Sequence, residues 1–224
     1  MKRYDEIAYS NLLTMAFDGV GPYDIPQIEP VYEVGDIDKW IGFNFANTNK
    51  KDRKHTGVHF YVDDYRFERV WNFPKKYVAL LKQFGTVMTP DFSTYLDFPE
   101  AIRIYNHYRR HWCGAFWQEM GLNVIPNIQW GRKDSYSWCF DGDPKGGIVA
   151  VSNVGMRKNK ENRRVFMDGY KEMLIRLQPK EVLVFGRSFD DYPGPTRYIE
   201  MELHKGDQGW ETKQETTDYL HKIA

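Results

Sequence analysis

The sequence predicts an α/β fold in which strands and helices alternate along the chain. Runs such as 148–154 and 181–186 are apolar on both faces, which is typical of parallel strands covered by helices. Between them lie longer segments whose apolar residues recur at helical spacing. We favour a reduced or irregular α/β barrel-like fold, because several strands end in polar residues and 224 residues fall short of the roughly 250 of a full barrel. The alternative is an open doubly wound parallel sheet.

Each predicted strand is an apolar run bounded by polar or turn-forming residues. The predicted strands are 40–46, 57–64, 86–93, 122–130, 148–154, 181–186 and 196–203. Pro90 lies within the third of them and removes a backbone donor, so it marks the end of that strand. This places Asp91 at the edge of the sheet.

Three helices are predicted between the strands. Pro74 favours the first turn of a helix and Gly85 its end. The other two helices span about 99–120 and 161–177. The second is expected to bury one apolar stripe, formed by Ile102, Tyr105, Trp112, Cys113, Phe116 and Met120. The third is expected to bury Phe166, Tyr170, Met173, Leu174 and Leu177.

The chain is predicted to form one domain with two appendages. Residues 1–39, rich in Gly, Pro and acids after position 18, are expected to form an irregular N-terminal arm packed on the domain. The α/β domain itself spans 40–203, and 204–224 form a polar C-terminal tail. Neither an internal repeat nor a low-complexity segment interrupts this organisation.

Composition bounds the setting of the protein. Thirty-one basic residues balance 31 acidic ones, so no overall charge would draw the chain to nucleic acid or to a membrane. No run approaches the roughly 20 apolar residues that span a bilayer, and the N-terminus lacks the apolar block of a signal peptide. Cys113 and Cys139 do not form a disulfide framework, and Cys113 is expected in the core. We therefore predict a cytoplasmic protein without a membrane partner.

Several short motifs in a fixed order resemble a known family. They are IPQIEP, VHFYVDD, TPDFS, NVIPNIQW, GIVAVSNVG and VLVFGR, and they span about residues 20–190. This combination is similar to the domain of unknown function family 4417 of phages and bacterial mobile elements. The resemblance implies a mobile-element origin and a cytoplasmic setting. It implies no established activity and no catalytic residues.

Carboxylates follow two predicted strands at the end where parallel sheets bind ligands. Asp63 and Asp64 end the second strand, and Asp91 ends the third. Asp63 and Asp91 are candidate catalytic residues and candidate ligands for Mg²⁺ or Mn²⁺, which favour hard oxygen donors. In the competing interpretation, Asp64 and Asp91 only stabilise turns through their side chains.

Two later strand ends carry candidate phosphate-binding residues. The first group lies between the fifth strand and the third helix, where free backbone N–H groups attract anions, and the second follows the sixth strand. The candidates are Ser152, Asn153, Gly155, Arg157, Lys158, Gly186, Arg187 and Ser188. The competing interpretation is a solvated basic loop.

Aromatic and histidine side chains give weaker indications. Trp130 and Trp138, together with Tyr136, occupy a Gly/Asp-rich region that is not typical of a core, so the two tryptophans are candidates for stacking on a substrate. His107 and His111 have metal-ligand spacing on one helix. Because three arginines accompany them, a solvated basic face is the favoured interpretation.

Two function hypotheses remain. The first is an enzyme, possible as a metal-assisted phosphoryl or nucleotide hydrolase, acting on a phosphate-bearing nucleotide or nucleic acid at the strand carboxyl ends. The second is a non-enzymatic binding protein that engages a host protein or sequesters a nucleotide. A sequence-specific DNA reader is disfavoured, because the chain has no helix-turn-helix pattern. The oligomeric state and the substrate are left open.

Overall fold

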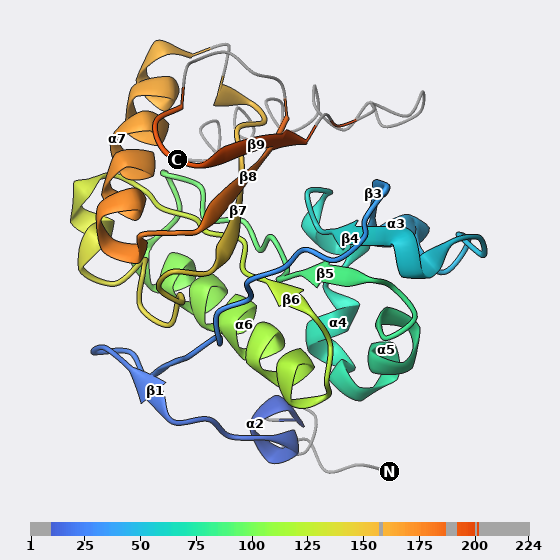
Figure 1. Cartoon of the computed structure of the whole chain (residues 1–224). Helices are drawn as coiled ribbons and strands as arrows, with labels where there is room; N and C mark the ends of the chain where they lie inside the picture. The colour runs from blue at the N-terminus through green and yellow to red at the C-terminus, as the bar shows by residue number, and fades with distance from the viewer. Residues whose placement is uncertain (1–9, 157–158, 187–191, 200, 202–224) are drawn as a thin grey trace, which may run out of the picture.

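The strands of the computed structural model are parallel and neighbour one another in chain order (Figure 1). The structure describes residues 10–156, 159–186, 192–199 and 201. One sheet has the order β3-β4-β5-β6 and the other β7-β8-β9. Their strands are β3 (Lys39–Gly42), β4 (Thr56–His59), β5 (Thr86–Met88), β6 (Val124–Ile125), β7 (Ile148–Ser152), β8 (Glu181–Phe185) and β9 (Thr196–Ile199). A parallel bridge between Asn127 and Ala150 connects the two sheets.

This strand order is that of a barrel that does not close. A doubly wound sheet reverses its strand order at a switch point, whereas here each strand follows its predecessor. The sheets curl enough for Phe185 on β8 to reach the opposite side, with its ring 5.1 Å from those of both Trp40 and Tyr61. Among the described strands no pairing joins β9 to β3. The predicted α/β alternation is confirmed, and the sheet is open.

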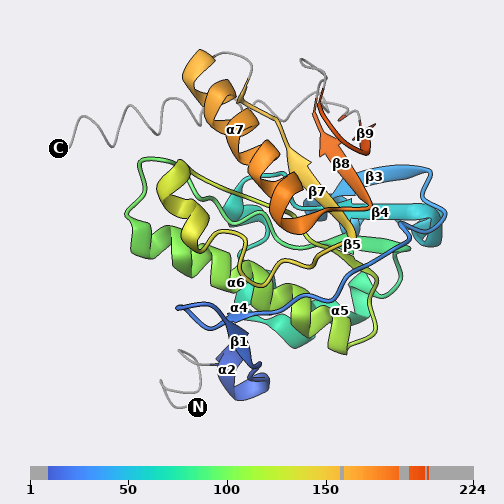
Figure 2. The same ribbon diagram turned by 60° about the vertical axis from the view of Figure 1, so that its left-hand side comes forward.

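Helices cover the outside of the curled sheets (Figure 2). The three longest are α5 (Pro74–Leu81), α6 (Glu100–Glu119) and α7 (Lys160–Leu177), which confirm the predicted helices. The short helices are α2 (Ser10–Thr14), α3 (Phe43–Ala46) and α4 (Arg69–Asn72). The Asn159 side chain caps α7 by accepting the backbone N–H groups of Glu161 and Asn162. The predicted inward face of α7 is also confirmed, with Leu174 only partly buried.

The N-terminal arm lies against the domain. Strands β1 (Gly19–Val20) and β2 (Ile25–Pro26) form a small antiparallel hairpin. Ile25 and Ile28 are fully buried, and the backbone N–H of Ile28 donates to the carbonyl of Gly142 at 2.9 Å. Farther along the arm, the carbonyl of Val31 accepts from Ile148 N–H at 2.7 Å. These bonds extend the start of β7 and fix the arm to it.

Several strands are shorter than predicted. The predicted strand 40–46 is wrong in its second half, since β3 ends at Gly42 and α3 follows. Phe43 and Ala46 are both buried and lie one helical turn apart, so the helix buries them on one side. Strands β4 and β5 likewise end before Asp63 and Asp91, because the chain leaves the sheet there to make side-chain hydrogen bonds.

The predicted buried face of α6 is wrong in its first half. Ile102 and Tyr105 are nearly half exposed. The buried positions in that half are polar: Arg103, Asn106, His107, Arg109 and Arg110. The apolar stripe resumes at Trp112, and Cys113 is buried as predicted. The expectation of a solvated basic face around His107 and His111 is therefore also wrong, since both histidines are buried.

Gly169 on α7 provides a test of how Trp130 is seated. A Cβ atom at position 169 would lie 2.1 Å from Cδ1 of the Trp130 ring. We expect Gly169→Ala to lower the free energy of unfolding by about 2 kcal/mol, since the ring must move within a packed core. Denaturant unfolding measures this. Gly146→Ala is no control because its φ is positive; Lys171→Ala, exposed on the same helix, is suitable and should change little.

Candidate anion-binding site

A chain of hydrogen bonds links the carboxyl ends of β4, β5 and β6. The Tyr61 hydroxyl donates to Oδ1 of Asn127 at 2.9 Å, and Nδ2 of Asn127 donates to Oδ1 of Asp91 at 2.8 Å. From the other side, Thr94 donates to Oε1 of Gln129 at 3.1 Å, and Gln129 Nε2 donates to the same oxygen of Asp91. All donors in the chain point toward Asp91, which suits an ionised carboxylate.

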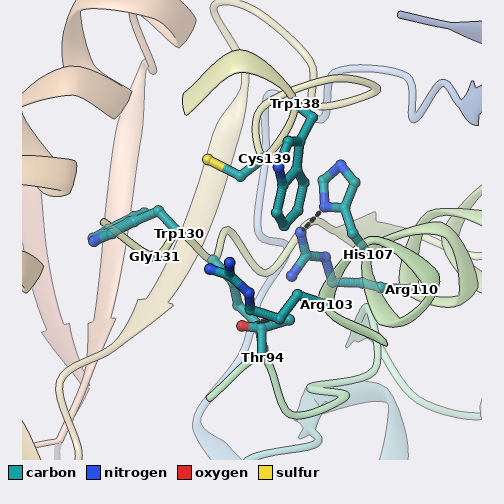
Figure 3. A pocket seen from close by; sticks show the side chains of 9 residues that line it. Thr94, Arg103, His107, Arg110, Trp130, Gly131, Trp138 and Cys139 are labelled. Atoms are coloured by element: carbon teal, nitrogen blue, oxygen red, sulfur yellow. Dashed lines mark hydrogen bonds between the residues drawn. The ribbon is translucent and has the colours of Figure 1, made fainter. Parts of the chain in front are cut away.

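A cavity opens beside this chain, between α6 and the loops that follow β5 and β6 (Figure 3). Its volume is about 10 Å³, which is room for about one water molecule. The lining residues are Thr94, Arg103, His107, Arg110, Gln129, Trp130, Gly131, Trp138 and Cys139. The burial of these residues is uneven: Thr94, Gln129 and Trp130 are partly exposed, and the others are buried. The partly exposed residues therefore form the mouth.

Arg110 is the most informative residue of the lining. It is 1% exposed, and its Nη2 donates to Nδ1 of His107 at 2.5 Å. Its Nε and Nη1 atoms have no hydrogen-bond partner among the described residues. Burial lowers the pKa of this guanidinium, and the charges of Asp143 and Asp91 only partly oppose the effect. Because a buried cation without full pairing is costly, its position requires another explanation.

Arg103 approaches the same cavity from one helical turn and a half earlier on α6. It is buried, its Nε has no partner among the described residues, and its guanidinium lies 6.0 Å from the Trp138 ring centre. Gly131 permits this approach, since a Cβ there would lie 2.8 Å from Nη1 of Arg103. Figure 3 shows Arg103 and Arg110 extending into the space beside Trp138.

The next arginine on the helix shows what a paired one looks like. Nη1 of Arg109 forms an ion pair with Glu68, and Nη2 donates to Asn106 at 2.7 Å. Its guanidinium also lies 3.9 Å from the centre of the Phe92 ring, where a cation is attracted by the aromatic face. Arg110 forms no ion pair within the described part of the chain. The two neighbours therefore differ in kind.

His107 contributes a neutral ring to the cavity wall. Its Nδ1 accepts from Arg110, so Nε2 carries the proton and donates to the carbonyl of Asp141 at 2.9 Å. Burial lowers the pKa of His107 well below its usual range, and the charges of His111 and Arg110 lower it further. The positive charge of the cavity therefore comes from the two arginines and persists at neutral pH.

His111 supports the cavity from behind. Its Nδ1 donates to the carbonyl of His107 at 2.9 Å, and its Nε2 lies 2.9 Å from Oδ1 of Asp143. Both side chains of the His111–Asp143 pair are fully buried. One proton is shared across that contact, so the pair is neutral overall and fixes α6 to the loop 131–147.

The carboxylates predicted as a catalytic or metal pair have separate contacts. Asp63 forms an ion pair with Arg66 at 3.4 Å. Asp64 caps the loop after β5, accepting from the backbone N–H of Ser93 at 3.0 Å and from its hydroxyl at 2.8 Å. Asp91 belongs to the hydrogen-bond chain described above. Within the described ranges no group of three or more His, Cys, Asp or Glu side chains gathers as metal ligands would.

The predicted phosphate loops are described only in part. Ser152 Oγ accepts from the backbone N–H of Val154 at 3.3 Å, and the buried Asn153 donates to Tyr192 at 2.9 Å. Gly155 and Gly186 both have positive φ, which favours glycine. A Cβ at Gly186 would lie 2.0 Å from Oδ1 of Asn153. The candidates Arg157, Lys158, Arg187 and Ser188 lie outside the described residues.

The aromatic residues of the Gly/Asp-rich region belong to the core, which corrects the expectation of a loop-like environment. Tyr136 and Trp138 are buried, and Trp138 Nε1 donates to Glu100 at 3.1 Å. Trp130 is partly buried and packs on Phe166 of α7, with ring centres 5.3 Å apart. Both tryptophans line the cavity. Whether either stacks on a ligand stays a prediction.

Sequence reasoning missed Arg103, His107 and Arg110 as the residues that meet at one site. The available signal was their spacing. Positions 103, 107 and 110 lie on one face of a helix, and the apolar stripe assigned to that half of α6 was incomplete. Without knowing which face was buried, the pattern is equally typical of a solvated basic helix.

Comparisons with known proteins place the chain in a family. The family model described as Domain of unknown function (DUF4417) matches residues 17–201. The "Gene 1 protein" of Mycobacterium phage L5 is 37% identical over 187 residues, which cover 82% of this chain and 80% of the relative. The "Gene 1 protein" of Mycobacterium phage D29 is 38% identical over 181 residues, covering 78% of this chain and 64% of the relative, less than two thirds of its length.

Neither a solved structure nor a membrane segment adds to these comparisons. No solved structure matches the chain. Across the described residues, no helix combines the length and apolar character needed to cross a bilayer. The family match covers most of the chain, and two phage relatives agree with it. The chain therefore belongs to the DUF4417 family.

Proposed function

We propose that this protein binds a phosphate-bearing nucleotide or nucleic acid at the carboxyl ends of its strands, with the phosphate held by Arg103 and Arg110. One observation carries the proposal. Arg110 is buried beside a cavity, and two of its nitrogens lack partners there. An anion entering the cavity would supply charge-assisted hydrogen bonds, which are about twice as strong as neutral ones. It would thereby offset the cost of burying the guanidinium.

The surroundings of the cavity favour an anion over other ligands. His107 cannot donate toward the arginines, because its Nδ1 accepts from Arg110. Cys139 contributes a thiol rather than a thiolate, since burial raises its pKa to about 12. The remaining wall is aromatic or amide. A ligand longer than one phosphate would extend toward β7, where the predicted Ser152, Asn153 and Gly155 elements would contribute.

The hydrolytic form of this proposal assigns chemistry to Asp91. The carboxylate is near enough to Arg110 to affect its pKa, and amides hold it in place. In this form Asp91 and Asp63 would bind Mg²⁺ or Mn²⁺ and activate a water. Release of inorganic phosphate from a nucleotide in the presence of these ions, abolished in Asp91→Asn, supports this form. Binding without turnover supports the sequestering alternative.

Phosphate binding is measured by thermal unfolding and calorimetry. We expect inorganic phosphate and nucleoside phosphates to raise Tm relative to chloride at matched ionic strength. A ligand at a hundredfold its Kd contributes about 2.7 kcal/mol of stability. Arg103→Gln removes one cation and should abolish most of this increase. Arg132→Gln is the matched control, because Arg132 is an exposed arginine on the neighbouring loop. An equal Tm response in Arg103→Gln and the parent would contradict the proposal.

Gly131→Ala tests the geometry of the cavity without changing its charge. The new Cβ would displace the end of the flexible Arg103 side chain. We expect phosphate affinity to fall by about tenfold, which corresponds to 1.4 kcal/mol. Titration calorimetry measures the affinity, and unfolding in denaturant verifies that stability is retained. Unchanged affinity would show that Arg103 is not positioned by this wall.

A further inference from the structure

We propose that the cavity is an end-group site that accepts a terminal phosphate monoester and excludes an internal phosphodiester. The inference rests on the proposed function and specifies the class of ligand. Its basis is the juxtaposition of a one-sided cavity with two unsatisfied buried arginines on α6. A nucleotide or a phosphorylated strand end would enter through the mouth formed by Thr94, Gln129 and Trp130.

The size and shape of the cavity exclude a continuous chain. A volume of about 10 Å³ admits one oxygen-sized group and no more. The wall opposite the mouth is closed by the buried residues His107, Arg110, Trp138 and Cys139. A phosphodiester has ester-linked nucleosides on both sides, so both would need a path out. A terminal phosphate carries its nucleoside on one side only, and that nucleoside can stay at the mouth.

The donors in the cavity also match a monoester better than a diester. Nε and Nη1 of Arg110 carry three N–H groups without partners in the described structure, and Arg103 Nε carries another. A phosphate monoester has three terminal oxygens and a charge of about −1.5 to −2 at pH 7. A diester has two such oxygens and one negative charge. The monoester therefore satisfies more of the donors and more of the buried positive charge.

The polar rim of the cavity fits a ligand that is anionic at its end and neutral behind it. Thr94 uses its proton on Gln129, and Gln129 uses its amide on Asp91. The Thr94 oxygen that remains is an acceptor, and the next charge beyond it is the carboxylate of Asp91. A second phosphate at the rim would be repelled by Asp91. The rim thus favours a single terminal phosphate followed by an uncharged sugar and base.

The test compares ligands that differ only in a terminal phosphate. Thymidine 5′-monophosphate is compared with thymidine, and 5′-phosphorylated tetrathymidylate with its 5′-hydroxyl form, by calorimetry on the full chain. We expect each phosphorylated ligand to bind at least about tenfold more tightly than its partner, as one lost charge-assisted contact would require. Arg103→Gln should remove the difference within each pair, and Arg132→Gln should preserve it.

The outcomes separate this inference from the proposed function. Equal binding of both tetrathymidylates, with both weakened in Arg103→Gln, would overturn the end-group site and leave phosphate binding standing. Absence of binding for inorganic phosphate and for thymidine 5′-monophosphate would overturn both. Tighter binding of thymidine triphosphate than of the monophosphate would contradict the single-phosphate rim. A preference for both phosphorylated partners, lost in Arg103→Gln, would support the site.

Discussion

Arg110→Met is expected to stabilise the protein and to eliminate its response to phosphate. Burial lowers the pKa of Arg110, so its surroundings on balance disfavour the charged side chain. Methionine fills a similar volume without that cost, and replacing buried charges by apolar groups is often neutral or stabilising. We expect the free energy of unfolding to rise by about 1 kcal/mol, and Tm by about 3 °C.

Arg110→Met should not leave a carboxylate unpaired, and this makes the prediction specific. Asp91 keeps the amide groups of Asn127 and Gln129, and Asp143 keeps His111. Arg109→Met is the contrasting variant, because it removes the partner of Glu68 and is expected to destabilise. A loss of stability in Arg110→Met similar to that in Arg109→Met would indicate a structural arginine. A gain in stability with no phosphate response is the signature of a binding residue.

The protein is expected to lose stability steeply as the pH falls below about 6.5. His59 is buried, and this burial lowers its pKa to about 4. Burial lowers the pKa of His107 as well. In the unfolded chain both rings take up a proton near pH 6.5, whereas in the folded chain they stay neutral. The free energy of unfolding is therefore complete above pH 6.5 and decreases as the pH falls toward 4.

His59 alone should account for about 3 kcal/mol of this loss, at 1.36 kcal/mol for each unit of pKa shift. Its ring stacks near Tyr61, and its Nδ1 accepts from the backbone N–H of Tyr61 at 3.2 Å. His59→Asn preserves an acceptor at that point and removes the titration. Urea unfolding from pH 7 to pH 5 should show a shallower decrease in this variant. His55→Asn, at an exposed position, serves as the control, and identical slopes in all three proteins would contradict the assignment.

The sequence by itself determined the alternation of elements. Apolar runs specified β7 and β8, and helical spacing specified α6 and α7, because these patterns follow from which faces must be buried. It also placed Asp91, Asn127 and Gln129 at strand ends, where the structure joins them in one hydrogen-bond chain. Local composition was enough for these predictions, because each depends on residues close together in the chain.

Only the tertiary structure decided which polar residues meet. The half of α6 that carries Arg103, His107 and Arg110 is buried because it lies over the polar strand ends and the loop 131–147, not over the apolar core. His111 and Asp143 hold that arrangement across 32 positions of sequence. A helix with this pattern is equally stable facing water, so periodicity alone could not choose. The packing partner decided it, and with it the cavity on which the function is proposed.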